Sequence, residues 1–129
     1  MIKGGILNPN FLSLMARVRH TNTLVIADRG FPFWPRVETV DLSLMDDIPT
    51  VCQVLAALKG NFTWGAAFMA EEFLAENGDS VRQAFAELVA PVMIQFDPHV
   101  DFKRRVPEAV GIIRTADTIQ YGNIILESA

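Results

Sequence analysis

The chain holds only one cysteine among its 129 residues and shows no excess of positive charge. A single cysteine excludes an internal disulfide, which is typical of a cytoplasmic protein. The net charge of −4 and the isoelectric point near 5.0 argue against a nucleic-acid binder, because such proteins normally carry a basic surface. No apolar run is long enough to span a bilayer, and the opening MIKGGILNPN lacks the apolar core of a signal peptide. We therefore expect a cytoplasmic protein that binds neither nucleic acid nor a membrane.

Motifs of several common mechanisms are missing as well. The sequence contains no GxxxxGK[ST] phosphate loop, no GxGxxG after a strand and no GxSxG elbow. Cys52 lies on the apolar stripe of a predicted helix, which favours a packing role over a nucleophilic one. The two histidines, His20 and His99, lack a paired spacing such as HxxxH. The pattern therefore predicts neither a metal site nor a cofactor.

Hydrophobic residues, by contrast, are abundant. They make up 50% of the chain, and the mean hydropathy of +0.25 is high for a small soluble protein. A domain of this size buries roughly two thirds of its unfolded surface. We expect the surplus apolar surface to cover contacts between subunits, so the composition predicts a homo-oligomer.

Apolar periodicity predicts helices that alternate with buried strands. The predicted helices begin at Asn8-Pro9, near Ile48 and at Asp79-Ser80. The predicted strands are residues 23–28, 37–42, 92–96, 110–114 and 123–126. The strand at 23–28 is apolar on both faces, which is typical of a parallel sheet covered by helices. Residues 65–77, GAAFMAEEFLAEN, favour a helix by composition, although 66–70 could form a buried strand. This order predicts a layered α/β fold in one domain, residues 1–129.

Polar side chains in loops or at strand ends are the candidate site residues: His20, Asp28, His99, Lys103, Tyr121 and Asn123. Asp28 is the carboxyl-terminal residue of the first predicted strand, the end at which ligands bind in open α/β sheets. His20 precedes the same strand, so meeting Asp28 would require the loop to fold back or a neighbouring subunit. Each candidate also has a structural alternative, such as a turn-capping aspartate or a hydrogen-bonded surface histidine. Trp34 could likewise stack on a sugar or pack in an interface or core.

Three segments of the chain carry a recognisable pattern: HTNTLVIADRGFP (20–32), HVDFK (99–103) and QYGNIIL (120–126). RVETVDLSL (36–44), IPTVCQVL (48–55) and AEE (70–72) add to it. Taken together, these segments resemble the ribose pyranase and fucose mutarotase family. It implies a single-domain, three-layer α/β/α sandwich with a mainly parallel sheet, and a strand within GAAFMAEE. It also implies a free monosaccharide substrate, ribose or fucose-like, and a ring-shaped homo-oligomer, commonly a decamer, with active sites near subunit contacts.

The resemblance also implies roles for individual residues. His20 falls on the catalytic histidine and Asp28 on the sugar-binding aspartate of the family. His99 falls on its second histidine, and the sugar-contacting tyrosine and asparagine fall on Tyr121 and Asn123. Lys103 matches a lysine near the second histidine.

Markers of the two branches of this family are mixed. Gly30, Thr21 and Thr23 are ribose-like, whereas Tyr121-Gly122-Asn123 has the fucose-type form. Arg19 and Asn22 replace a usual glycine and aspartate on either side of His20-Thr21. The resemblance is closer to the D-ribose pyranase branch. An L-fucose-type anomer mutarotase and a non-catalytic monosaccharide-binding subunit remain the alternatives.

For a mutarotase of this kind we expect His20 to be the general acid/base. Ring opening needs a proton delivered to the ring oxygen and another removed from the anomeric hydroxyl. An imidazole can do either near neutral pH, and such catalysis contributes roughly 10²–10⁴-fold. Asp28 would orient the imidazole or a sugar hydroxyl, while His99, Tyr121 and Asn123 would hold other hydroxyls.

Overall fold

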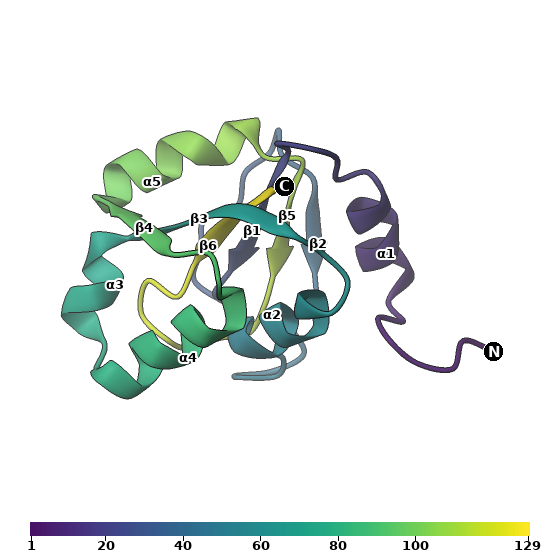
Figure 1. Ribbon diagram of the computed structural model, residues 1–129, viewed down its shortest axis with the longest axis horizontal. Helices are drawn as coiled ribbons and strands as arrows, with labels where there is room; N and C mark the ends of the chain where they lie inside the picture. Colours follow the sequence, from purple (N-terminus) through teal and green to yellow (C-terminus); the bar gives the residue numbers. More distant parts are fainter.

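The computed structural model describes residues 1–129 and contains one six-stranded sheet in the order β2-β5-β1-β6-β3-β4 (Figure 1). The strands are β1 (Thr23–Ala27), β2 (Thr39–Asp41), β3 (Trp64–Ala70), β4 (Ile94–Asp97), β5 (Gly111–Arg114) and β6 (Ile124–Ser128). The helices are α1 (Pro9–Ala16), α2 (Val51–Lys59), α3 (Glu71–Glu76), α4 (Asp79–Val89), α5 (His99–Arg105) and the short 3-10 helix η1 (Val106–Glu108). All neighbouring pairs are parallel except those of β6, which runs antiparallel to β1 and β3.

Helices cover both faces of this sheet. Leu24 and Ile26 of β1 point into a core shared with α1, α2 and α4. Val25 and Ala27 point the other way, into a core shared with α5 and η1. Figure 1 shows the sheet between α5 on one side and α2 and α4 on the other. This arrangement confirms the expected α/β/α sandwich, and it explains why the segment TLVIA shows no alternation of apolar and polar residues.

Helix α2 begins later than predicted. We predicted its start near Ile48, but the helix begins at Val51 and Ile48 is 49% exposed in the preceding loop. Thr50 caps it: the Thr50 hydroxyl accepts the Gln53 N–H, and the Gln53 side chain accepts the Thr50 N–H. This capping box was a stronger start signal than the apolar stripe that we followed.

The start of α4 was predicted at the correct residue for the wrong reason. Asp79 and Ser80 were expected to cap the helix, but both lie inside it and Gly78 occupies the cap position without a side-chain hydrogen bond. The start of α1 agrees with expectation, since Asn8 Oδ1 accepts the Phe11 N–H at 2.9 Å.

The ambiguous segment divides into a strand and a helix. Residues 64–70 form β3, and 71–76 form α3. Pairing of β3 with β6 on one side and β4 on the other overrides the helix propensity of its alanines and methionine. The strand implied by the family resemblance is confirmed.

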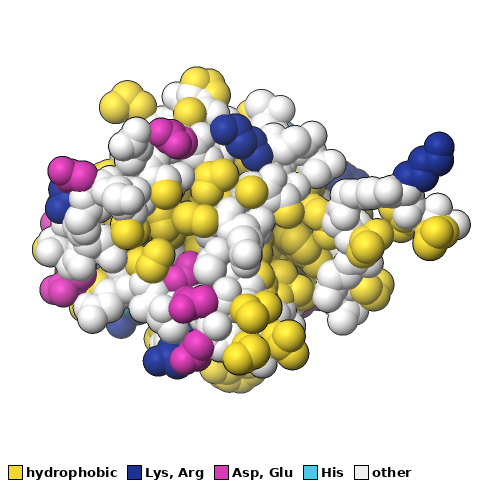
Figure 2. Space-filling model, turned by 90° about the horizontal axis from the view of Figure 1, so that it is seen from below, with side chains coloured by type: hydrophobic (Ala, Val, Ile, Leu, Met, Phe, Trp, Pro, Cys, Tyr) yellow, Lys and Arg dark blue, Asp and Glu magenta, His cyan; other side chains and the backbone are white.

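Large hydrophobic side chains remain on the surface. Leu44, Phe33 and Met93 are 78%, 74% and 86% exposed. Figure 2 shows hydrophobic side chains spread across the face seen from below and along the N-terminal segment, which projects from the body. Exposed apolar side chains of this size are available for contacts with other molecules.

Candidate functional site

The reversed direction of β6 brings distant polar residues to one edge of the sheet. Asp28 follows the carboxyl end of β1, and His99 begins α5 just beyond the carboxyl end of β4. Because β6 is antiparallel to β1, with Ile26 paired to Ile124, its start lies beside the end of β1. Tyr121 and Asn123, which precede β6, are therefore placed at this same edge.

A hollow of about 240 Å³ opens at this edge. Four of the six predicted site residues line it: Asp28, His99, Tyr121 and Asn123. The remaining walls come from Gln120 and from residues 30–32 in the turn after β1. Polar groups that converge in a concave site are the usual form of a small-ligand pocket.

Asp28 is the buried carboxylate of the hollow. Its side chain accepts the Gly30 N–H at 3.0 Å, and its own backbone N–H donates to Asn123 Oδ1 at 2.7 Å. Burial raises the pKa of Asp28 above its usual value, against the opposing effect of hydrogen bonds from Gly30 and Asn123. The carboxylate is thus held in place, partly desolvated, where it can accept a hydrogen bond from a ligand hydroxyl.

His99 contributes an imidazole packed between two aromatic rings. The ring meets Tyr121 edge-on, with centroids 5.1 Å apart, and lies parallel to Phe102 at 6.0 Å. Its Nδ1 atom is buried and has no hydrogen-bond partner in the protein. Burial and then the charge of Lys103 lower the pKa of His99, so the ring is neutral at pH 7. A neutral imidazole can both donate to and accept from hydroxyl groups.

Tyr121 lies in a tight turn closed by a hydrogen bond from the Gly122 N–H to the Ile119 carbonyl at 3.2 Å. Its φ of 54° is unusual for a residue with a large side chain. A Cβ atom at Gly122 would come within 3.1 Å of the Ile119 oxygen and 3.3 Å of the Ile119 side chain. The close approach of Ile119 is therefore a packing reason for glycine at position 122. The fucose-type form of Tyr121-Gly122-Asn123 is not by itself a sign that the substrate is fucose.

Sequence reasoning missed two residues that hold this site together. Arg114 ends β5 beside Ala27 of β1, and its guanidinium donates to the carbonyls of Asp28, Arg29 and Pro32 at 3.2–3.4 Å. Glu72 accepts the backbone N–H of His99 with both carboxylate oxygens, at 3.2 and 3.0 Å. Neither contact is visible without the strand register that creates it.

His20 lies far from the hollow in the same chain. It is exposed in a turn before β1, closed by the Asn22 N–H donating to the Arg19 carbonyl at 3.0 Å. The five-residue strand β1 separates it from Asp28, a span of roughly 17 Å. Lys103 is half-buried one turn along α5 from His99 and does not line the hollow either.

The side chains of Trp34 and Cys52 pack against the two hydrophobic cores. Trp34 contacts the core beneath α5 and stacks near Phe31, with ring centroids 6.3 Å apart, and it does not line the hollow. Cys52 packs against the core beneath α2, and burial raises the pKa of its thiol to about 11. These placements favour the packing interpretation of each residue over the chemical one.

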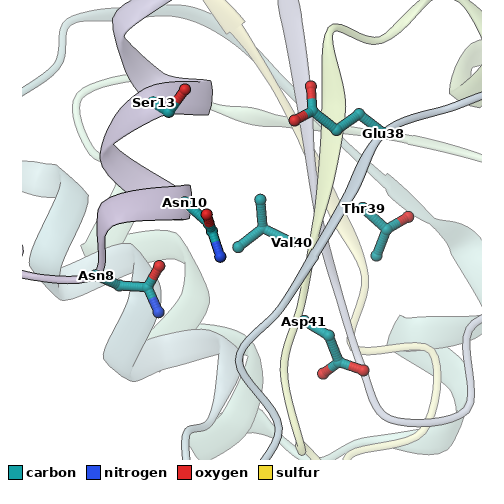
Figure 3. A pocket seen from close by; sticks show the side chains of 7 residues that line it. All are labelled: Asn8, Asn10, Ser13, Glu38, Thr39, Val40 and Asp41. Atoms are coloured by element: carbon teal, nitrogen blue, oxygen red, sulfur yellow. The ribbon is translucent and has the colours of Figure 1, made fainter.

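Another polar hollow lies between α1 and β2 (Figure 3). Its charged groups are already paired: Glu38 accepts two hydrogen bonds from Arg17, and Asp41 accepts the Ser43 N–H. Asn8 is engaged as the cap of α1. The structure contains no group of three or more His, Cys, Asp or Glu residues placed to hold a metal ion. It also has no helix whose length and hydrophobicity would allow it to cross a membrane.

Comparisons with known proteins show the family and the fold of the chain. A family model described as the RbsD / FucU transport protein family matches residues 1–129. The chain is 38% identical to the D-ribose pyranase of Geobacillus kaustophilus (strain HTA426), covering 99% of this chain and 93% of that protein. It is 37% identical to the D-ribose pyranase of Geobacillus thermodenitrificans (strain NG80-2), covering 99% of this chain and 96% of that protein.

Solved structures extend the comparison to the whole fold. Bacillus subtilis RbsD complexed with D-ribose superposes with a TM-score of 0.92 at 31% identity, covering 100% of this chain and 98% of that one. The fucose mutarotase of Streptococcus pneumoniae, in complex with L-fucose, gives a TM-score of 0.80 at 16% identity, covering 95% and 92%. The similarity to the fucose mutarotase shows a shared fold only.

Proposed function

Because the chain belongs to the RbsD / FucU family, we propose that it is a sugar mutarotase that interconverts the pyranose and furanose forms of D-ribose. The observation that carries the proposal is the hollow where a buried carboxylate, a neutral imidazole, a phenol and an amide converge. The likeness over the full chain to proteins named D-ribose pyranase supports the choice of sugar.

The hollow suits a reaction in which proton transfer lets one C–O bond of the sugar ring break and another form, without any change of oxidation state. Asp28, His99, Tyr121 and Asn123 hold sugar hydroxyls, whereas Lys103, which does not line the hollow, acts on His99 through its charge. The ring opens when a proton reaches the ring oxygen and the anomeric hydroxyl loses one. It closes through a different hydroxyl to change from pyranose to furanose. Holding the open chain in place favours reclosure over escape.

The general acid/base of this proposal is His20, supplied by a neighbouring subunit. Since His20 stands at the opposite end of β1 from the hollow, one copy cannot bring the two together. The exposed apolar residues Leu44, Phe33 and Met93 provide surface for such contacts. The assembly we propose is a ring-shaped homo-oligomer, of the decameric kind that the family resemblance implies.

Proton NMR saturation transfer on ribose and fucose at equilibrium tests the activity directly. We expect a trace of protein to speed exchange between the pyranose and furanose signals of ribose. Exchange limited to the anomers of fucose would move the assignment to the mutarotase branch. Ribose binding without any exchange would make the chain a non-catalytic binding subunit and would refute the catalytic role of His20.

Complementation between two inactive variants tests the shared site. His20→Ala keeps the hollow and Asp28→Asn keeps the histidine, so co-expressed subunits that mix at random should recover about a quarter of the wild-type sites. Asp28→Asn with His99→Ala is the control, because both changes damage the hollow and no mixture repairs it. Gel filtration accompanies the test, and a monomer, or no recovery in the first mixture, rules out a site built across subunits.

A further inference from the structure

Glu72 and His99 occupy equivalent places on two neighbouring strands. β3 and β4 are parallel, and Ala70 is paired with Asp97 at their carboxyl ends. Two residues beyond this pair, each strand has passed into a helix: β3 leads to Glu72 in α3, and β4 leads to His99 in α5. The register alone therefore brings a carboxylate side chain to the backbone of the histidine.

The contact replaces a helix cap that α5 lacks. Pro98 occupies the cap position of α5, and it has no side-chain oxygen to accept a hydrogen bond from the first turn. The free N–H of His99 donates instead to both carboxylate oxygens of Glu72, at 3.2 and 3.0 Å. A carboxylate at a helix start is also favoured by the helix dipole. Glu72 thus fixes the residue from which the imidazole projects.

We propose that Glu72 is a positioning residue for His99: its carboxylate holds the first residue of α5 so that the imidazole faces the sugar hollow. The inference rests on the proposed function, since it concerns the same hollow. The ring itself has few other restraints, because it lies against Tyr121 and Phe102 but makes no side-chain hydrogen bond within the protein. Its position in the hollow consequently depends on the backbone that Glu72 anchors.

Glu72 also acts on the electrostatics of His99. The charged groups that face His99 are Lys103 from its own helix, Glu72 from α3 and Asp28 from the end of β1. Burial and Lys103 lower the pKa of His99, whereas Glu72 and Asp28 raise it. Removing the charge of Glu72 should therefore lower the pKa of His99 further. A lower pKa of His99 would distinguish the loss of Glu72 from the loss of a structural contact elsewhere in the protein, which would leave that pKa unchanged.

Three variants separate the possible roles. Glu72→Ala removes both the acceptor and the charge, and we expect it to reduce kcat/KM for ribose exchange roughly tenfold, chiefly through KM, as for a lost helix cap. Glu72→Gln keeps an acceptor oxygen of the same shape, so kcat/KM should stay within about threefold of wild type. Glu71→Ala is the matched control: Glu71 is exposed in the same first turn of α3 and should leave kcat/KM unchanged.

NMR titration of the imidazoles provides the second readout. The chain has two histidines, so a His20→Asn background leaves only the signals of His99. We expect the pKa of His99 to fall in both Glu72 variants and to stay unchanged in Glu71→Ala. If Glu72→Ala does not fold, Glu72→Gln still tests the inference through this titration.

Two results would overturn the inference: a Glu72→Ala protein with wild-type KM, or an unchanged pKa of His99 in Glu72→Gln. Failure of the proposed function has a different signature, namely that the wild-type protein itself does not speed ribose exchange. In that case the dissociation constant for ribose is compared among the variants instead of KM. The pKa of His99 is compared among them in the same way as before.

Discussion

Replacing Asn123 by alanine is expected to weaken the fold and sugar binding together. Asn123 is only 4% exposed, and its Oδ1 accepts the Asp28 backbone N–H at 2.7 Å. Alanine leaves that buried N–H without a partner, which costs roughly 1–3 kcal/mol of unfolding free energy. The side-chain amide also holds down the pKa of Asp28, so its loss makes the carboxylate still easier to protonate.

Asn123→Asp gives a sharper comparison because it keeps the acceptor oxygen and adds a charge. A second carboxylate beside Asp28 raises the pKa of the pair above that of the unfolded chain. The folded protein then binds more protons than the unfolded one, so its stability falls as the pH rises through that range. The stability deficit of Asn123→Asp should therefore widen between pH 5 and pH 8, and at pH 5 it should be smaller than that of Asn123→Ala.

Urea denaturation at a fixed protein concentration, at both pH values, measures these deficits, and NMR titration with ribose measures binding. Fixed concentration matters because the stability of an oligomer depends on it. Our account of the site is wrong if Asn123→Ala unfolds at the wild-type urea midpoint. It is equally wrong if the deficit of Asn123→Asp does not change with pH.

Three further predictions follow from the buried groups. Because burial raises the pKa of Asp28 above its usual 3.8, the wild-type fold loses stability as the pH rises above that value. Asparagine does not titrate, so the free energy of unfolding of Asp28→Asn, measured by urea denaturation, should rise relative to that of the wild type as the pH increases. The same variant should bind ribose more weakly. Gly122→Ala should destabilise the fold by roughly 1–3 kcal/mol, and adding Ile119→Ala should not recover it, because the Ile119 carbonyl oxygen and Cβ that the new methyl group meets are still present in alanine. Cys52, with a pKa of about 11, should react with iodoacetamide at pH 8 roughly a hundredfold more slowly than in urea-unfolded protein.

The layered fold could be predicted because its signals are local. The apolar run TLVIA indicated a strand covered on both faces, and the stripes of the helices marked their buried sides. The direction of β6 could not be predicted, since its sequence NIIL has the same character whether it runs parallel or antiparallel. That direction follows from the turn at Ile119–Gly122 and from pairing with β1 and β3, which are interactions between distant segments.

The candidate site was predictable to the extent that it depends on strand ends. Asp28 and Asn123 stand next to apolar runs, so their positions at an edge of the sheet could be expected. Glu72 and Arg114 stand at strand ends too, but their partners are backbone groups of the segments that follow neighbouring strands. Nothing in the sequence indicates that Ala70 pairs with Asp97 or Ala27 with Arg114. The groups that support a site are therefore harder to predict than those that face the ligand.

The length of β1 links the proposed chemistry to assembly. His20 and Asp28 lie beyond opposite ends of a five-residue strand, which keeps them roughly 17 Å apart in a folded subunit. In the proposed function each subunit therefore serves two different sites, giving the hollow to one and the histidine to the next. Such head-to-tail sharing is complete for every subunit only if the chain of contacts closes on itself. The ring that the family resemblance implies meets this condition, as would a two-fold dimer with reciprocal sharing, whereas an open or incomplete assembly would retain sugar binding while losing catalysis at its ends.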